Sequence, residues 1–184
     1  LADATGHGLT AAISVLPVLA IFYRLTRTNH PVKEIIAELN QQLAESMPIG
    51  RFVAVTLVRI DDIAKSGEIW VGGTPPAFLL DRWGRKLREF PSENLPLGIV
   101  DSKTLGCQAV SFTWETESQL IICSDGLMEA SNHAGIQFGE TGLMAAAAHA
   151  SPETRFSQID SALLKHLNGS PAADDVSLMI IDCP

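Results

Sequence analysis

The chain has 184 residues, of which 46% are hydrophobic, so it is long enough to form one domain with a sizeable core. Its formal net charge of −8 argues against a nucleic-acid-binding surface. The three cysteines are odd in number and form no CxxC pair, which argues against a structural zinc site and favours a reducing compartment, the cytoplasm. The longest mostly apolar run, residues 9–22, is shorter than the roughly 20 residues that a membrane span needs, so we expect no membrane segment.

Two helices are predicted at the start of the chain. Residues 9–27 are expected to form a buried helix that Pro17 can bend. Pro31 suits the first position of a second helix, which should end near Met47. Apolar residues at spacings of three and four give this second helix one apolar stripe, made of Val32, Ile35, Ile36, Leu39 and Leu43.

The middle of the chain is rich in strand patterns. Trp83 and Gly84 indicate a tight hairpin turn, and residues 73–76 (GTPP) indicate another turn. The basic cluster of Arg82, Arg85, Lys86 and Arg88 is flanked by acidic residues, and we interpret it as a solvated hairpin. Strands are predicted at residues 52–60, 68–72, 77–80, 86–90, 107–114, 119–124 and 176–182.

Two further helices are predicted before the last strand. Residues 142–149 are rich in alanine, and Ser151 and Pro152 suit the cap and first position of a helix that Gly169 would end. Its apolar stripe would be Phe156, Ile159, Leu163 and Leu167. Because the helices are grouped rather than alternating with strands, we expect a single α+β domain over residues 1–184 with antiparallel sheets.

Three acidic turns beside apolar segments stand far apart in the chain. They are residues 3–8 (DATGHG), residues 124–126 (SDG) and the pair Asp174-Asp175. Carboxylate and carbonyl oxygens are the ligands that Mg²⁺ and Mn²⁺ prefer, and Asp3, Asp125, Asp174 and the carbonyl of Ala4 would supply them. Two such ions about 3.5–4 Å apart would hold a bridging hydroxide for in-line attack on a phosphate monoester. The three aspartates are therefore the candidate catalytic residues.

Each acidic turn also has an ordinary structural interpretation. Asp3 would cap the helix beginning near Gly8, Asp125 would belong to a plain Asp-Gly turn, and Asp174 would lie in a solvated loop. His7 would either donate a proton to the leaving oxygen or fix its loop by packing. The conjunction of three such turns favours the metal site over these separate interpretations.

The ordered motifs resemble those of one family. Residues 3–8 (DATGHG), 124–130 (SDGLMEA) and 174–178 (DDVSL) are similar to motifs of the PP2C-like serine/threonine phosphatases of the bacterial sporulation-phosphatase type. Supporting matches are residues 52–56 (FVAVT), 72–76 (GGTPP), 97–99 (LGI) and 138–139 (FG). The resemblance runs in family order and covers nearly the whole chain.

The resemblance implies a four-layer α+β fold, with two antiparallel sheets packed together and helices outside. It implies a binuclear Mg²⁺ or Mn²⁺ site held by Asp3, the Ala4 carbonyl, Asp125 and Asp174, with Asp175 the less favoured neighbour. The implied substrate is a phosphoserine or phosphothreonine on a small regulatory protein of the anti-sigma-factor-antagonist type. It also implies partner-switching signalling, an attached sensory or response-regulator receiver domain upstream, and a homodimer as one assembly.

Two departures from the family pattern define an alternative function. The family has an upstream strand ending in Gly-Asp, whose aspartate is a metal ligand, and we expect it to precede Leu1 in a longer protein. At Thr74 the family has a histidine. A chain without these groups would act as a phosphatase-like scaffold that binds a regulator without catalysis.

Overall fold

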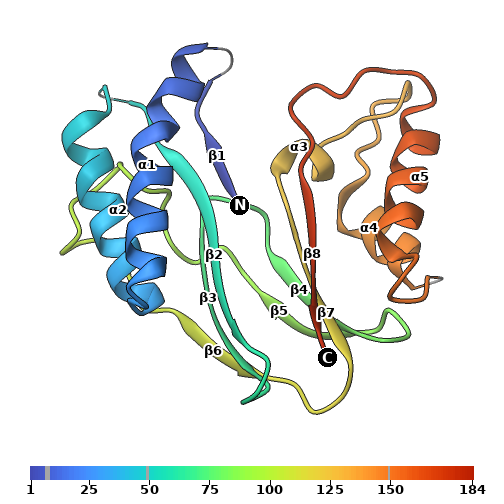
Figure 1. The fold of residues 1–184 in the computed structure, drawn as a ribbon. Helices are drawn as coiled ribbons and strands as arrows, with labels where there is room; N and C mark the ends of the chain where they lie inside the picture. Colours follow the sequence, from blue (N-terminus) through green and yellow to red (C-terminus); the bar gives the residue numbers. More distant parts are fainter. Residues whose placement is uncertain (7–8, 49, 149) are drawn as a thin grey trace. The chain divides into compact units, whose positions relative to one another are not determined.

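The computed structural model describes residues 1–6, 9–48, 50–148 and 150–184, with the side chains of residues 9–15 and 17 left out. The chain divides into two compact units (Figure 1). The first unit comprises residues 1–74 and 92–113, and the second comprises residues 75–91 and 114–184. Each unit is built from two separate stretches of chain, and the expectation of one domain over residues 1–184 stays a prediction.

The first unit contains a four-stranded antiparallel sheet in the order β1-β2-β3-β6. Its strands are β1 (Ala2–Ala4), β2 (Val53–Asp61), β3 (Ser66–Gly72) and β6 (Val110–Thr113). The three-residue strand β1 was not among the predicted strands, because so short a segment carries no alternation of polar and apolar residues. Strand β6 is shorter than the predicted strand at residues 107–114.

Helices α1 (Leu9–Arg27) and α2 (Val32–Ser46) cover one face of this sheet (Figure 1). All five residues of the predicted stripe of α2 are buried, and they pack with alternate residues of β2, namely Val53, Val55 and Leu57. The expectation that α1 is buried is wrong for one of its sides. Leu16, Leu19 and Tyr23 are about half exposed or more, whereas Val18 and Leu25 are buried.

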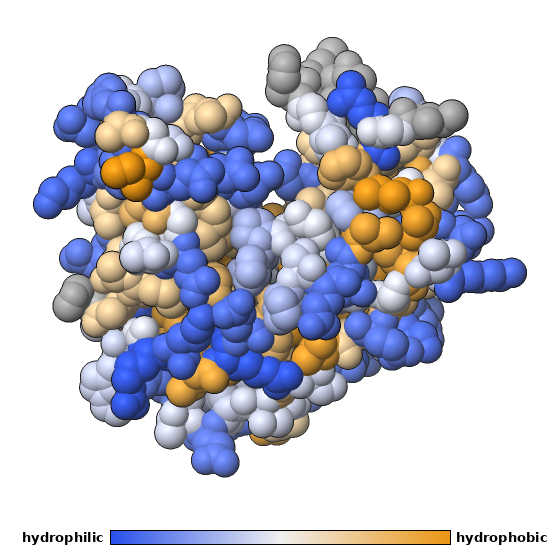
Figure 2. Space-filling model, turned by 180° about the vertical axis from the view of Figure 1, so that it is seen from behind, coloured by the Kyte–Doolittle hydropathy of each residue, from blue (hydrophilic) through white to orange (hydrophobic). Residues whose placement is uncertain are grey.

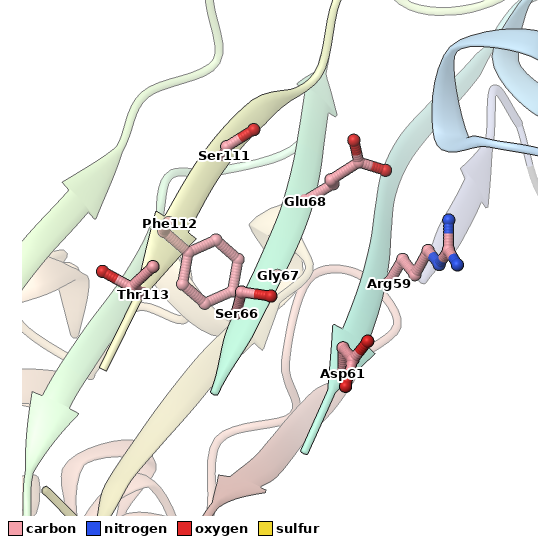
Figure 3. A pocket seen from close by; sticks show the side chains of 8 residues that line it. All are labelled: Arg59, Asp61, Ser66, Gly67, Glu68, Ser111, Phe112 and Thr113. Carbon is pink, nitrogen blue, oxygen red and sulfur yellow. The ribbon is translucent and has the colours of Figure 1, made fainter. Parts of the chain in front are cut away.

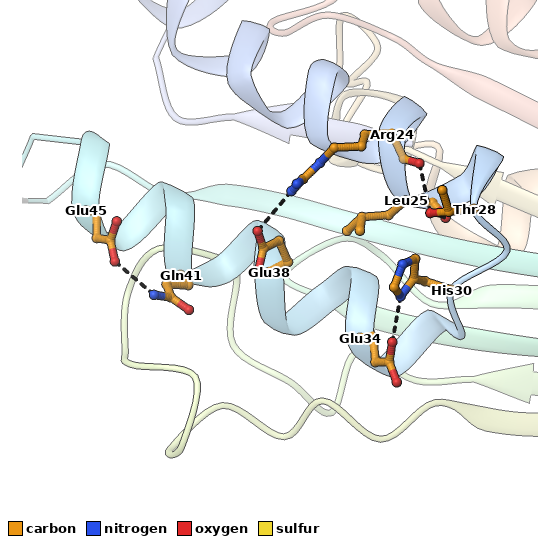
Figure 4. A network of polar contacts seen from close by, with 8 residues as sticks. All are labelled: Arg24, Leu25, Thr28, His30, Glu34, Glu38, Gln41 and Glu45. Carbon is orange, nitrogen blue, oxygen red and sulfur yellow. Dashed lines mark hydrogen bonds and ion pairs between the residues drawn. The ribbon is translucent and has the colours of Figure 1, made fainter.

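Exposed polar contacts lie between the two helices and at the start of α2 (Figure 4). The Arg24 guanidinium of α1 donates to Glu38 Oε1 of α2 at 3.0 Å. At the start of α2, His30 Nδ1 lies 2.7 Å from Glu34 Oε2. These pairs are exposed and stabilise the helical hairpin by no more than about 1 kcal/mol each, so the buried apolar stripe of α2 supplies most of its stability.

The second unit contains another four-stranded antiparallel sheet, in the order β5-β4-β7-β8. Its strands are β4 (Ala77–Asp81), β5 (Lys86–Phe90), β7 (Ser118–Cys123) and β8 (Leu178–Cys183). The predicted tight turn at Trp83-Gly84 is confirmed, since Gly84 has a φ of +79° and its N–H donates to the Asp81 carbonyl at 3.0 Å. All six residues of β7 are buried.

Three helices complete the second unit: α3 (Asp125–Met128), α4 (Gly139–Ala147) and α5 (Arg155–Leu167). Helices α4 and α5 pack against the sheet of this unit through Leu143, Ile159 and Leu163, which contact Phe78 and Ile121 of the sheet in one buried cluster. The short helix α3 begins where we expected a plain turn. Four residues are too few for a helical apolar pattern to appear in the sequence.

Helix α5 begins later than predicted. Its first residue is Arg155, and Ser151 and Pro152 precede it in a turn. Phe156 is 53% exposed, whereas Arg155 is fully buried. Arg155 lies on the buried face four residues before Ile159 and donates to backbone carbonyls there, so it takes the place that we expected for Phe156.

The fold class is confirmed: two antiparallel four-stranded sheets with grouped helices make an α+β fold. None of the described helices combines the length and apolar composition that crossing a membrane requires. On the face drawn in Figure 2, hydrophilic residues predominate and hydrophobic ones gather in a few patches.

Candidate metal centre

Asp3 lies in the first unit, at the middle of strand β1. It pairs with Ala54 of β2 and is half buried. Asp3 therefore occupies a strand rather than the cap of α1, which begins six residues later at Leu9. The interpretation of Asp3 as a helix cap is not supported, and its role as a metal ligand stays a prediction.

The turn that follows Asp3 and Ala4 is held by two residues. Thr5 Oγ1 donates to the Phe52 carbonyl at 2.6 Å and accepts from the Phe52 N–H at 2.7 Å. Arg51 Nη1 donates to the Thr5 carbonyl at 2.7 Å. Gly6 has a φ of +94°, and any Cβ there would collide with the Arg51 guanidinium. The positive φ is what favours glycine at position 6, since the flexible Arg51 side chain could move away from a Cβ.

Arg51 is a residue that the sequence interpretation missed. It stands 46 residues from Thr5, and no motif links the two positions. Only the pairing of β1 with β2 brings Arg51 beside the turn. His7 and Gly8, including both expected roles of His7, lie outside the described residues.

Asp125 lies in the second unit, at the first position of α3 and directly after buried strand β7. Its side chain is exposed, and its Oδ1 accepts the Gly126 N–H at 2.8 Å. A carboxylate at a helix N-terminus also lies in the favourable field of the first N–H groups. The Asp125 carboxylate therefore faces solvent, and the backbone of Asp125 is held between buried strand β7 and helix α3.

The turn with Asp174 and Asp175 lies against the same end of β7. Ser124 Oγ donates to the Asp175 carbonyl at 3.0 Å and accepts from the Ser177 N–H at 2.9 Å. The Ser124 N–H donates to the Ser177 carbonyl at 3.0 Å. A Cβ at Gly126 would collide with the Asp175 carbonyl oxygen. The structure therefore brings two of the three predicted acidic turns together, 49 residues apart in the chain.

The donor set in this unit fits a hard divalent cation. The carboxylates of Asp125 and Asp174 are both exposed, and each uses Oδ1 to accept the N–H of the following residue, at 2.8 and 2.7 Å. No donor among the described residues binds the Oδ2 atom of either side chain. One oxygen is thus fixed by the backbone and the other is available to a ligand such as Mg²⁺ or Mn²⁺.

Within the described residues, no three His, Cys, Asp or Glu side chains gather to hold a metal. The predicted set draws Asp3 and the Ala4 carbonyl from the first unit and the other two carboxylates from the second. Neither unit contains the whole set, so the assembly of Asp3, Asp125 and Asp174 into one centre stays a prediction.

Cys123 lies one residue before the Ser124-Asp125 turn, yet it is not a nucleophile. The thiol is fully buried, and burial together with the nearby Asp125 carboxylate raises its pKa to about 12. A thiol with such a pKa stays protonated at neutral pH and is inert.

Thr74 stands where the resembled family has a histidine. Its side chain is 4% exposed, and its hydroxyl lies 2.6 Å from that of Thr56 on β2. Because the two hydroxyls satisfy each other inside the first unit, Thr74 has a structural role that explains its burial.

A cavity of about 330 Å³ lies where β2 ends, β3 begins and β6 ends (Figure 3). Its lining includes Arg59, Asp61 and Glu68, and Glu68 Oε2 is buried without a hydrogen-bond partner among the described residues. None of the predicted site residues lines this cavity. It therefore does not belong to the candidate metal centre.

Comparisons with known proteins agree on one fold. The family model of stage II sporulation protein E (SpoIIE) matches residues 1–184. The SiaA PP2C domain of Pseudomonas aeruginosa superposes with a TM-score of 0.79 at 16% identity, covering 97% of this chain and 72% of that one. The SpoIIE phosphatase domain of Bacillus subtilis, with a fragment of its regulatory domain, superposes with a TM-score of 0.76 at 17% identity. The superposition covers 97% of this chain and 52% of that one.

A third structure contains the RsbU and RsbW domains of a Mycobacterium tuberculosis protein, with a TM-score of 0.74 and 19% identity, covering 97% of this chain and 50% of that one. The chain thus spans about half the length of the last two structures. No curated protein matches it in sequence. Because the family model matches every residue from 1 to 184, the chain belongs to the SpoIIE family of PP2C-type phosphatase domains.

Proposed function

We propose that the chain is a metal-dependent protein serine/threonine phosphatase. It would hydrolyse a phosphoserine or phosphothreonine on a small regulatory protein of the anti-sigma-factor-antagonist type. The observation that carries the proposal is the hydrogen-bonded junction of the Asp125 turn with the Asp174 turn, in a chain of the SpoIIE family. Two exposed carboxylates on a fixed backbone suit the binding of Mg²⁺ or Mn²⁺.

Asp125 and Asp174 would hold the ions from the second unit, and Asp3 with the Ala4 carbonyl would hold them from the first. When bound, a pair of such ions supplies an activated water and neutralises charge on the phosphate oxygens. The residues of the chain fix the geometry. Ser124 sets the spacing of the two turns in the second unit, and Arg51 holds the turn after Ala4.

The partners proposed for the whole protein follow from the same family. The Bacillus subtilis structure includes a fragment of a regulatory domain, and the Mycobacterium tuberculosis structure includes an RsbW domain beside its RsbU domain. These neighbours support a sensory or receiver domain attached upstream and a role in partner-switching signalling in the cytoplasm. A homodimer is one assembly that such a protein would form.

The test measures hydrolysis of 4-nitrophenyl phosphate by the full-length protein in Mn²⁺. We expect turnover in the wild type, none above background in Asp125→Asn, and near wild-type turnover in the matched control Asp175→Asn. Equal turnover in Asp125→Asn and wild type would refute the assignment. A wild type that shows no turnover but binds the regulatory protein would favour the alternative, a catalytically impaired scaffold, which the threonine at position 74 motivates.

A further inference from the structure

The tip of the β4–β5 hairpin, residues 81–85, exposes an aromatic ring between two guanidinium groups. Trp83 is 63% exposed, although Trp70 and Trp114 are almost fully buried. The guanidinium carbons of Arg82 and Arg85 lie 5.5 and 5.4 Å from the centre of the Trp83 ring. These distances are typical of cation–π contacts, which hold both cations beside the ring.

Hydrogen bonds to the buried Asp81 carboxylate hold the backbone of the tip. Asp81 is 3% exposed, and its Oδ1 accepts the N–H groups of Trp83 and Arg85, both at 2.9 Å. Its Oδ2 accepts Arg85 Nε at 2.6 Å. Burial raises the pKa of Asp81, but these hydrogen bonds outweigh it and hold the pKa below its usual value. The carboxylate therefore stays ionised at neutral pH and holds the backbone of Trp83 and Arg85 in place through these hydrogen bonds.

The fully buried Arg155 supports the same tip. Its Nη2 donates to the carbonyls of Asp81 at 3.2 Å and Arg82 at 3.0 Å, and its Nη1 donates to Gln119 Oε1. These bonds offset part of the cost of burying a guanidinium, while Arg155 Nε is buried without a hydrogen-bond partner among the described residues. At Gly84 a Cβ would collide with the Ala147 carbonyl at the end of α4, so the turn lies directly on that helix. The tip is therefore held by hydrogen bonds from Arg155 and by close contact with the end of α4.

The charge of the tip is opposite to that of the chain. The tip carries Arg82 and Arg85, and Lys86 and Arg88 follow it on β5, in a chain of net charge −8. Lys86 is paired with Glu89 and Glu140, both at 2.7 Å, and Asp81 engages only Nε of Arg85. Within the part of the chain that the structure describes, Arg82 makes no salt bridge, although its charge interacts with that of the exposed Glu153. Guanidinium N–H groups of Arg82 and Arg85 are thus available to carboxylates beside an exposed indole.

We propose that this tip is a docking surface for an acidic segment of a partner protein. Tryptophan and arginine are the residues that contribute most to protein–protein affinity, especially when their own side chains are held in place. An extended polyanion such as nucleic acid would meet the repulsion of a chain with net charge −8, whereas a short acidic segment needs only the tip.

The surface is separate from the candidate metal ligands of the second unit, Asp125 and Asp174. Asp81 pairs with Ser118 at the start of β7, whereas Asp125 follows the end of that strand. At about 3.3 Å per residue, the length of β7 puts about 20 Å between them. The proposal therefore does not depend on phosphatase activity.

The test titrates the full-length protein with a short fluorescein-labelled poly-glutamate peptide, followed by fluorescence anisotropy. Poly-glutamine of the same length and an oligothymidylate are the competing probes. We expect saturable binding of poly-glutamate that weakens with added salt, and protection of Trp83 from acrylamide quenching. The affinity should fall at least about tenfold in Trp83→Ala and about fivefold in Arg82→Gln.

Arg88→Gln is the matched control, because it removes the same charge from β5, where the guanidinium lies 4.9 Å from the Phe90 ring instead. Its affinity should stay within about twofold of the wild type. Circular dichroism and thermal melts of each variant establish that it is folded. The proposal is overturned if poly-glutamate does not bind below ~1 mM, if Arg82→Gln and Arg88→Gln weaken binding equally, or if the oligothymidylate binds more tightly than poly-glutamate.

Discussion

Ser124 donates its hydroxyl hydrogen to the carbonyl oxygen of Asp175 at 3.0 Å, and this bond joins two acidic turns that are distant in the chain. The same hydroxyl accepts the Ser177 N–H at 2.9 Å, so one buried side chain satisfies two backbone groups. The spacing of the Asp125 and Asp174 carboxylates therefore depends on a serine that need not contact a metal or substrate.

Replacing Ser124 with alanine should weaken both the fold and the site. Two backbone groups lose their partner, which should lower the free energy of unfolding by about 1–3 kcal/mol. Mn²⁺-dependent turnover should fall in protein that is still folded, because the two turns are no longer held together. Urea unfolding and turnover measured on the same preparation check this. Ser131→Ala, which removes only a bond to the Glu129 carbonyl, is the control, and a Ser124→Ala variant with wild-type stability would contradict the account.

Arg51 should matter for activity more than for stability. Its exposed guanidinium holds the Thr5 carbonyl at 2.7 Å, so Arg51→Ala frees the turn that follows Asp3 and Ala4. Displacing a site by about 1 Å can cost about a hundredfold in rate, and we expect a loss of kcat/KM of at least about tenfold. The melting temperature should change little. Arg59→Ala removes an exposed arginine from the same unit and should leave kcat/KM unchanged; equal losses in the two variants would mean that the Thr5 contact is irrelevant.

The pKa of Asp81 predicts a pH-dependent contribution to stability. Because this pKa is lower in the folded chain than its usual value of 3.8, the ionised carboxylate stabilises the fold above that pH. The contribution is lost as the pH falls through the lower, folded pKa. Asp81→Asn should therefore be less stable than the wild type by about 1–3 kcal/mol at pH 7. The difference in free energy of unfolding between the wild type and the variant, measured with urea, should become smaller below pH 3.8. A difference that stays constant from neutral to acid pH would contradict this prediction.

Cys123 should resist thiol reagents in the folded protein. Burial and the Asp125 carboxylate raise its pKa to about 12, so almost no thiolate exists at pH 8. Peptide mapping after N-ethylmaleimide treatment should find Cys123 unmodified until the protein is denatured, and turnover should survive the treatment. Rapid modification of Cys123 with loss of turnover would instead point to a reactive thiol at the site.

Most of the fold could be predicted because long elements carry a period. The stripe of α2 from Val32 to Leu43 and the apolar strand β7 follow from residue spacing alone. Strand β1 and helix α3 could not be predicted, since three or four residues contain no period. Arg155 was missed for another reason: a buried guanidinium is explained only by the carbonyls around it, and these come from distant segments.

The candidate site was partly accessible to sequence reasoning. The aspartates stand in recognisable turns, so their residue types and neighbours could be interpreted. The side chains that position those turns could not, because Ser124 and Arg51 act on backbone groups 51 and 46 residues away. Such contacts arise from strand pairing and have no local signal.

The central claim is that Asp3, Asp125 and Asp174 belong to one metal centre, and Mn²⁺ binding tests it most directly. Free Mn²⁺ is measured by electron paramagnetic resonance during titration of the full-length protein and of four variants. Asp3→Asn, Asp125→Asn and Asp174→Asn should each bind Mn²⁺ at least about tenfold more weakly than the wild type, whereas Asp175→Asn should stay within about twofold. Wild-type affinity in Asp3→Asn together with Asp125→Asn and Asp174→Asn would contradict the account.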